Sequence, residues 1–123
     1  MRVLIVDDDP TTAELTAECL MMDPSVSVRI AGDGASALVC VAEFEPEAVL
    51  LDIELPDVSG LDLATQLKAA CSGRAPRIII FSGSVPRTDM SVLPDGVDAW
   101  LTKPAHIDEL LDSIHRPLGF WPR

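Results

Sequence analysis

Two patterns of apolar residues alternate along the chain. The first pattern is a short run of apolar residues, and in one such run apolar and polar residues alternate. Such runs are followed by stretches in which apolar residues recur every three or four positions. The short runs are typical of strands, and the longer spacing is typical of helices with one buried face. The strands that this predicts lie at residues 3–6, 26–30, 48–51, 78–81 and 100–101. The chain is therefore expected to alternate strand and helix throughout.

The helical segments are marked by apolar residues that share one face. The first begins at Pro10, because the first turn of a helix does not need the N–H that proline lacks, and it continues to about residue 22. We expect its residues Leu15, Cys19 and Leu20 to face inward. The later helical patterns are carried by Ala35, Leu38, Val39 and Ala42, then by Leu63, Ala64, Leu67, Ala70 and Cys71, and last by Ile107, Leu110, Leu111 and Ile114.

This alternation predicts an α/β fold with a doubly wound, five-stranded parallel sheet and helices on both of its faces. The chain has 123 residues, which fits one domain. We expect the domain to span residues 1–116 and a non-helical tail to follow at 117–123. The fourth helix is predicted to be short or distorted, or to end early, because residues 84–96 contain Pro94 and a turn-forming Asp95-Gly96 pair.

Polar residues stand at the carboxyl ends of four predicted strands. Asp7 and Asp8 follow the first strand, Asp52 the third, Ser82 the fourth and Lys103 the fifth. In an open parallel sheet these ends meet at one edge, which is where such folds bind ligands. Any one of these residues is more often a turn or capping residue. Their agreement at four strands predicts a shared site.

The residue types at this edge suit phosphoryl chemistry. Three carboxylates repel one another unless a cation lies between them, and Mg²⁺ suits such a site because it prefers oxygen ligands. A carboxylate can attack phosphorus and form an aspartyl phosphate. A metal ion and Lys103 would neutralise the phosphoryl oxygens, and the hydroxyl of Ser82 would donate a hydrogen bond to them. The set is complete for accepting a phosphoryl group.

Four stretches carry a resemblance to a known family. They are residues 3–10 (VLIVDDDP), 50–61 (LLDIELPDVSGL), 79–83 (IIFSG) and 100–104 (WLTKP). In this order and spacing they resemble the receiver domains of bacterial response regulators, and the resemblance covers nearly the whole chain. It implies a flavodoxin-like receiver fold in a two-component phosphorelay protein, similar to the stand-alone chemotaxis regulators.

The resemblance implies a role for each acidic residue. Asp52 would be the phosphoacceptor and would also touch Mg²⁺. Asp8 would bind the ion directly, Asp7 mainly through water, and the backbone carbonyl of Glu54 would be a further ligand. The Glu54 side chain either lies in solvent or repels an anionic phosphodonor and holds an attacking water away.

The resemblance also implies a switch. Lys103 would contact the phosphoryl group, Ser82 would be the switch hydroxyl, and Trp100 would replace the usual switch Tyr or Phe. The phosphodonor would be a histidine kinase or a histidine phosphotransfer protein. The domain would catalyse only its own phosphorylation and hydrolysis, so it would not be an enzyme in the ordinary sense. Phosphorylation would shift the population of conformers and change a surface read by a downstream protein.

Charge and cysteine content limit the partners and the location. The chain carries 20 Asp and Glu against 9 Lys and Arg, a formal charge of −11, which repels nucleic acid and anionic membranes. We therefore expect neither direct nucleic-acid binding nor membrane association. Cys19, Cys40 and Cys71 form no CxxC pair and are interpreted as reduced core thiols. The first apolar run is too short for a signal peptide, so a cytoplasmic location is expected.

Two other functions fit parts of the sequence. Residues 7–11 match the DxDxT pattern of haloacid-dehalogenase-like phosphatases, with Asp7 as nucleophile and Asp9 as acid. This alternative leaves Asp52 unexplained. The second alternative is a phosphorylation-independent interaction module on the same fold, which Trp100 and the altered fourth helix allow.

Overall fold

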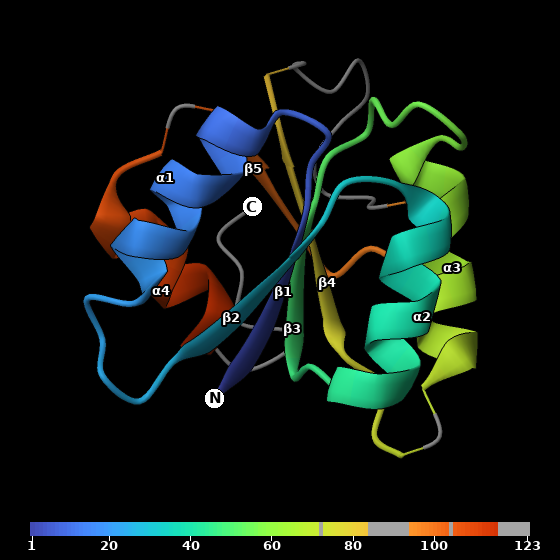
Figure 1. The fold of residues 1–123 in the computed structure, drawn as a ribbon, viewed down its shortest axis with the longest axis horizontal. Helices are drawn as coiled ribbons and strands as arrows, with labels where there is room; N and C mark the ends of the chain where they lie inside the picture. Colours follow the sequence, from blue (N-terminus) through green and yellow to red (C-terminus); the bar gives the residue numbers. More distant parts are fainter. Residues whose placement is uncertain (72, 84–93, 104, 116–123) are drawn as a thin grey trace.

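Five parallel strands form one sheet in the computed structural model of the protein (Figure 1). The structure describes residues 1–71, 73–83, 94–103 and 105–115. The strands are β1 (Arg2–Val6), β2 (Ser27–Ala31), β3 (Ala48–Leu51), β4 (Arg77–Ser82) and β5 (Ala99–Thr102). They lie side by side in the order β2-β1-β3-β4-β5, and all four pairings are parallel. The predicted five-stranded parallel sheet is confirmed.

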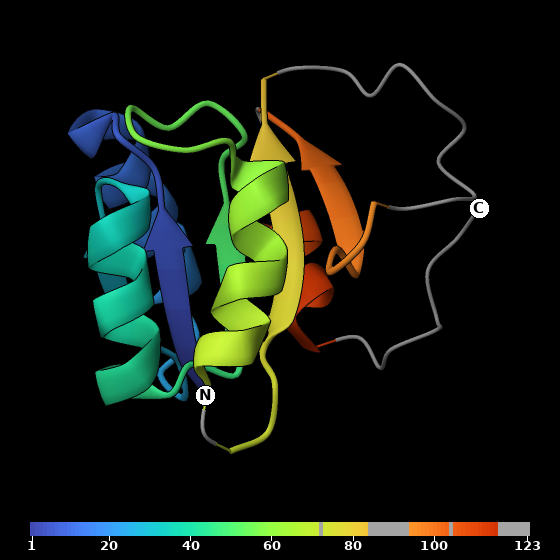
Figure 2. The same ribbon diagram turned by 90° about the vertical axis from the view of Figure 1, so that its right-hand side faces the viewer.

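Helices cover both faces of the sheet. The described residues form α1 (Pro10–Leu20), α2 (Gly34–Phe44), α3 (Gly60–Ala70) and α4 (Ile107–His115). One face carries α1 and α4 and the other carries α2 and α3, as Figures 1 and 2 show. Because each strand is parallel to the next, α1, α2 and α3 all begin at the carboxyl edge of the sheet. No helix in the described part of the chain is long and apolar enough to span a membrane.

Alternate residues of the inner strands build two separate cores. In β1, Val3 and Ile5 join the apolar cluster beneath α1 and α4, whereas Leu4 and Val6 join the cluster beneath α2 and α3. All four side chains are at most 2% exposed. A strand that is buried on both faces needs an unbroken apolar run, and this is why residues 3–6 have that composition.

The inner faces of the first two helices differ from the prediction. The buried residues are Ala13, Thr16, Ala17 and Leu20 in α1 and Gly34, Ala37 and Val41 in α2. Leu20 is buried as predicted, but Leu15, also predicted to face inward, is 58% exposed. Val39, which carried the helical pattern of the second helix, is exposed to the same extent. Small residues such as Ala13, Ala17, Gly34 and Ala37 make up most of the two inner faces.

Most of the residues that carried the helical patterns of α3 and α4 do face the cores. Leu63, Ala64, Leu67, Leu110 and Ile114 are buried, and Ala70, Cys71 and Leu111 pack against the clusters while partly exposed. The side chain of Ile107 lies outside the described residues.

The segment before β5 is described only in part. The predicted short or distorted fourth helix falls mainly on residues 84–93, which lie outside the described residues, as does the predicted tail at 117–123. The predicted turn at Asp95-Gly96 is confirmed, and the N–H of Val97 donates to the carbonyl of Pro94 at 3.0 Å. Gly96 has a φ of 80°, which glycine adopts without strain. The domain boundary at residue 116 stays a prediction.

Candidate functional site

Three carboxylates lie together at the carboxyl edge of the sheet. Val6 of β1 is in register with Leu51 of β3, so the residues that follow them, Asp7 and Asp52, emerge side by side. The sheet hydrogen bonding continues past the strands, because the N–H of Asp52 donates to the carbonyl of Val6 at 2.9 Å. One oxygen from each of Asp7, Asp8 and Asp52 lies within 4.8 Å of the other two. The structure therefore brings the three predicted carboxylates into one group.

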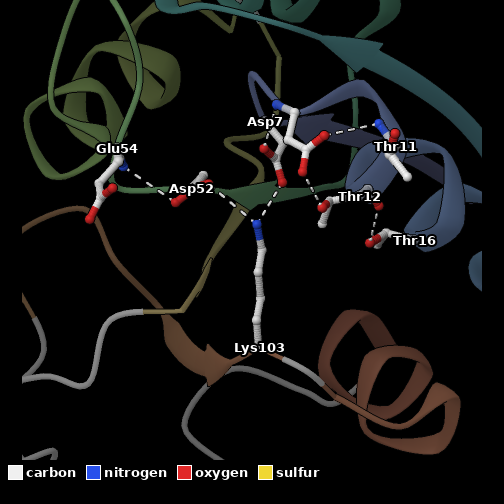
Figure 3. Close-up of polar contacts among 8 residues, drawn as sticks. Asp7, Thr11, Thr12, Thr16, Asp52, Glu54 and Lys103 are labelled. Atoms are coloured by element: carbon white, nitrogen blue, oxygen red, sulfur yellow. Dashed lines mark hydrogen bonds and ion pairs between the residues drawn. The ribbon is translucent and has the colours of Figure 1, made fainter.

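Lys103 reaches into this group from the end of β5 (Figure 3). Its Nζ lies 2.6 Å from Oδ2 of Asp7 and 3.3 Å from Oδ2 of Asp52. The same Nζ stands 5.4 Å from the centre of the Phe81 ring, within range of a cation–π contact. Burial by itself lowers the pKa of Lys103, but the hydrogen bond to Asp7 and the charge of Asp52 outweigh it, and the pKa is raised. A stable positive charge is thus held between two of the carboxylates.

Asp9 lies next to the group but binds the first turn of α1. Its Oδ1 accepts a hydrogen bond from the N–H of Thr11 at 3.1 Å, and its Oδ2 accepts one from the hydroxyl of Thr12 at 2.7 Å. The Thr12 hydroxyl is the largest of the contacts that lower the pKa of Asp9. The N–H of Asp9 donates to Oδ1 of Asp7 at 2.9 Å. Asp9 therefore caps the helix with its side chain and orients Asp7 with its backbone.

The loop of residues 53–59, here called the β3–α3 loop, folds back on Asp52. The N–H of Glu54 donates to Oδ1 of Asp52 at 3.3 Å (Figure 3), and Glu54 forms an antiparallel bridge with Ser59. A Cβ added to Gly60 would lie 2.1 Å from the carbonyl oxygen of Asp52. Glycine is required for this close approach. The role of the Glu54 carbonyl as a metal ligand stays a prediction.

Ser82 and Trp100 occupy the two neighbouring strands. Ser82 ends β4 with 2% exposure, and its carbonyl accepts a hydrogen bond from the N–H of Lys103 at 2.8 Å. Trp100 is in register with Ile80 and packs against the cluster beneath α2 and α3. Its indole Nε1 is buried and has no hydrogen-bond partner in the described part of the chain. The switch roles of Ser82 and Trp100 stay predictions.

The acidic group fits a divalent cation. Asp7, Asp8 and Asp52 each offer a carboxylate oxygen to a common point, and such oxygens are the ligands that Mg²⁺ prefers. Lys103 bonds two of the three carboxylates and supplies a single positive charge. The group therefore keeps a negative balance that an added cation would neutralise.

Three contacts at this edge were not predicted from the sequence. They are the Phe81 ring beside Lys103, the approach of Gly60 to Asp52, and the carboxylate of Asp57 on the first turn of α2. Gly60 carried a signal, because a glycine at the start of a helix beside a functional residue is typical of close backbone packing. The other two contacts join segments that are distant in sequence, and no local pattern predicts them.

The chain resembles proteins of established families over nearly its whole length. The family profile described as "Response regulator receiver domain" matches residues 3–115. The "Probable transcriptional regulatory protein TcrX" of Mycobacterium tuberculosis is 34% identical over 111 residues, which cover 90% of this chain and 47% of that protein. The chain spans about half the length of the curated relatives it matches.

Solved structures share the fold. A CheY-like response regulator receiver domain protein from Methanospirillum hungatei has a TM-score of 0.79 and 29% identity, covering 92% of this chain and 89% of that one. A response regulator from Burkholderia pseudomallei has a TM-score of 0.81 and 26% identity, covering 94% of this chain and 66% of that one. The latter structure contains a phosphorylated aspartic acid, a calcium ion and citrate.

Proposed function

Because the chain belongs to the response regulator receiver domain family, we propose that it is a phosphorylation-dependent switch in which Asp52 accepts a phosphoryl group. Members of this family are signalling proteins of two-component systems rather than conventional enzymes. The observation that carries the proposal is the setting of Asp52. Its Oδ2 lies 3.3 Å from the ammonium of Lys103, its Oδ1 lies 3.3 Å from the N–H of Glu54, and Asp7 and Asp8 stand beside it.

The phosphodonor would be a phosphohistidine on a histidine kinase or a histidine phosphotransfer protein. The carboxylate of Asp52 would attack the phosphorus, so that an oxygen–phosphorus bond forms while the donor's phosphorus–nitrogen bond breaks. The electron pair of the broken bond returns to the imidazole, which takes up a proton. Lys103 supports this step because its ammonium already lies beside the attacking carboxylate and can stabilise charge on the phosphoryl oxygens.

Asp7, Asp8 and Asp52 would hold Mg²⁺, joined by the Glu54 carbonyl that the family resemblance adds. Such an ion supplies neutralising charge to the phosphoryl oxygens. The protein's own contribution is orientation. Asp7 is fixed on one oxygen by the N–H of Asp9 and on the other by Lys103, so it cannot turn away from the group without losing both bonds.

Signal output would pass through the two strands next to Asp52. The hydroxyl of Ser82 would donate to the bound phosphoryl group, and the ring of Trp100 would follow it inward. A protein partner would read the changed surface. The relative TcrX is named a transcriptional regulatory protein and is about twice as long as this chain, so DNA binding in a longer protein would belong to residues outside this stretch. The cytoplasmic location stays a prediction.

The test is intact-protein mass spectrometry after incubation with acetyl phosphate or phosphoramidate. We expect one phosphoryl adduct on the wild type in Mg²⁺, none in EDTA, and none on Asp52→Asn, because the nucleophile is then lost. Asp9→Asn is the matched control, since Asp9 is adjacent in space but binds α1, and it should still form the adduct.

Other outcomes would point to the alternatives. A protein that binds Mg²⁺ but forms no adduct with either small donor or with a histidine phosphotransfer protein would support the phosphorylation-independent module. An adduct that survives Asp52→Asn and disappears in Asp7→Asn would support the phosphatase-like chemistry. Membership of the receiver family and the capping role of Asp9 both argue against that second outcome.

A further inference from the structure

The first turn of α2 is capped by two different aspartates. Asp33 precedes the helix and accepts a hydrogen bond from the N–H of Ser36 at 2.7 Å, as N-cap residues commonly do. Asp57 accepts from the N–H of Gly34 on Oδ1 at 2.8 Å and from the N–H of Ala35 on Oδ2 at 3.1 Å. The two bonds join residues that are 23 and 22 positions apart in the sequence. The second cap ties α2 to the β3–α3 loop.

Side-chain packing holds the same contact closed. Gly34 is buried against Val58, and a Cβ added to Gly34 would lie 2.5 Å from Cγ1 of Val58. Val58 in turn packs against the apolar cluster beneath α2 and α3. The N–H of Gly34 is the largest cause of a lowered pKa at Asp57, and an ionised carboxylate is favoured at a helix N-terminus. The charged hydrogen bonds of Asp57 and the packing of Val58 on Gly34 therefore both hold the β3–α3 loop against α2.

The other end of the loop is fixed to the phosphoacceptor. The N–H of Gly60 donates to the carbonyl of Ile53 at 2.8 Å, and Glu54 bridges to Ser59. Within this closed loop the N–H of Glu54 donates to Oδ1 of Asp52. A short segment thus connects the carboxylate that would be phosphorylated with a helix on the face of the sheet that also carries α3 (Figure 1).

We propose that Asp57 is a positioning residue for the Mg²⁺ and phosphoryl site. By holding the β3–α3 loop against α2, it keeps the backbone of Glu54 in place beside Asp52. This inference rests on the proposed function of Asp52. Coupling between two sites is reciprocal, so ion binding at the acidic group also strengthens the bonds from Gly34 and Ala35 to Asp57. The first turn of α2 therefore responds to the state of the site.

A purely structural role for Asp57 would be to stabilise α2. Asp33 provides the matched control, because it caps the same turn of the same helix and its side chain forms no hydrogen bond with the described residues of the β3–α3 loop. Asp57→Ala and Asp33→Ala should both lower the melting temperature of the metal-free protein. They should differ in what they do to the ion site.

The experiment is a titration of the unphosphorylated protein with Mg²⁺, followed by amide NMR, on the wild type and both variants. We expect Asp57→Ala to weaken Mg²⁺ binding by about 10-fold, the lower end of the effect of residues that orient metal ligands. Asp33→Ala should leave the affinity unchanged. Mg²⁺ should slow hydrogen exchange at the amides of Gly34 and Ala35 in the wild type and not in Asp57→Ala.

Two further variants guard against misfolding. Asp57→Asn keeps one acceptor oxygen and should weaken binding less than Asp57→Ala. Gly34→Ala pushes on Val58 from the helix side and should weaken binding while Asp57 stays intact. Equal affinities in Asp57→Ala and the wild type, or equal losses in Asp57→Ala and Asp33→Ala, would overturn the inference. A wild type that neither binds Mg²⁺ nor accepts a phosphoryl group would instead overturn the proposed function.

Discussion

The two edges of the sheet both carry charged residues but use them differently. At the amino edge, Nε of Arg2 donates to the carbonyls of Phe44 and Glu45 at 2.9 and 3.0 Å, and Nη1 of Arg77 donates to the carbonyl of Ser113 at 3.1 Å. These carbonyls end α2 and α4, where a helix leaves its last acceptors without partners. At the carboxyl edge, three carboxylates lie together and Lys103 bonds two of them. Arg2 and Arg77 are thus satisfied by helix carbonyls at one edge, whereas the acidic group at the other edge keeps an unmatched negative charge.

The comparison shows why a hollow in the surface does not by itself identify a site. A hollow of about 460 Å³ lies at the amino edge and is lined by Arg2, Glu47, Arg77 and His115, among others. Two of its arginines, Arg2 and Arg77, already bind helix carbonyls, and Arg2 also faces Glu47 at 4.0 Å. The acidic group at the carboxyl edge is built so that it could hold a metal ion, and this makes it the candidate functional edge.

The largest effect is expected when Lys103, the lysine at the carboxyl edge, is replaced. Lys103→Ala should slow phosphorylation of Asp52 by about 100-fold, because one preorganised group that stabilises the reacting oxygens is lost. The measurement is the initial rate of adduct formation by mass spectrometry with acetyl phosphate in saturating Mg²⁺.

Lys68→Ala is the control for that variant. Lys68 also forms an ion pair with an aspartate, 2.8 Å from Asp98, but it lies on α3 away from the acidic group. It should change the melting temperature and leave the phosphorylation rate intact. Equal phosphorylation rates in Lys103→Ala and Lys68→Ala would show that phosphorylation of Asp52 does not depend on the lysine at the carboxyl edge.

A smaller effect is expected from the amino edge, and it concerns stability alone. Arg77→Met keeps most of the packing and removes the hydrogen bond to the Ser113 carbonyl, so it should lower the free energy of unfolding by about 1 kcal/mol. Urea unfolding followed by circular dichroism measures this. The phosphorylation rate should not change, and a large loss of phosphorylation would contradict the division between the two edges.

An effect of similar size but opposite sign is expected at the carboxyl edge. Asp8→Asn removes one of three neighbouring negative charges, so it should raise the free energy of unfolding of the metal-free protein by about 1 kcal/mol. Saturating Mg²⁺ should cancel or reverse the difference, because only the wild type keeps the full set of ligands. Urea unfolding in EDTA and in Mg²⁺ gives both values. A loss of stability in EDTA would show that the carboxylates do not repel one another.

Features that depend on local composition were predicted from the sequence. Unbroken apolar runs marked the strands because residues buried on both faces must all be apolar, as in β1. Asp7, Asp8, Asp52 and Lys103 could be placed together because the carboxyl ends of parallel strands meet at one edge. The structure brings these four residues together as expected.

Features that depend on the rotation of a helix about its axis, or on contacts between residues distant in sequence, were not predicted. A spacing of three to four residues defines the period of a helix and leaves its rotation open, so Leu15 was placed inward although Ala13 and Ala17 face the sheet. The bond between Asp57 and Gly34 joins residues 23 apart. It forms because β2 and β3 lie on either side of β1 and are parallel, so the loops that follow them meet at the same edge.

The close approach of Gly60 to Asp52 limits how this sequence can vary over generations. The space that a side chain at position 60 would fill is taken by the backbone carbonyl oxygen of Asp52, the proposed phosphoacceptor. A lineage that keeps Asp52 in this position must therefore also keep glycine at position 60, although Gly60 offers no functional group. The residues that must be kept at this site therefore include one that contributes no functional group and is required because it has no side chain.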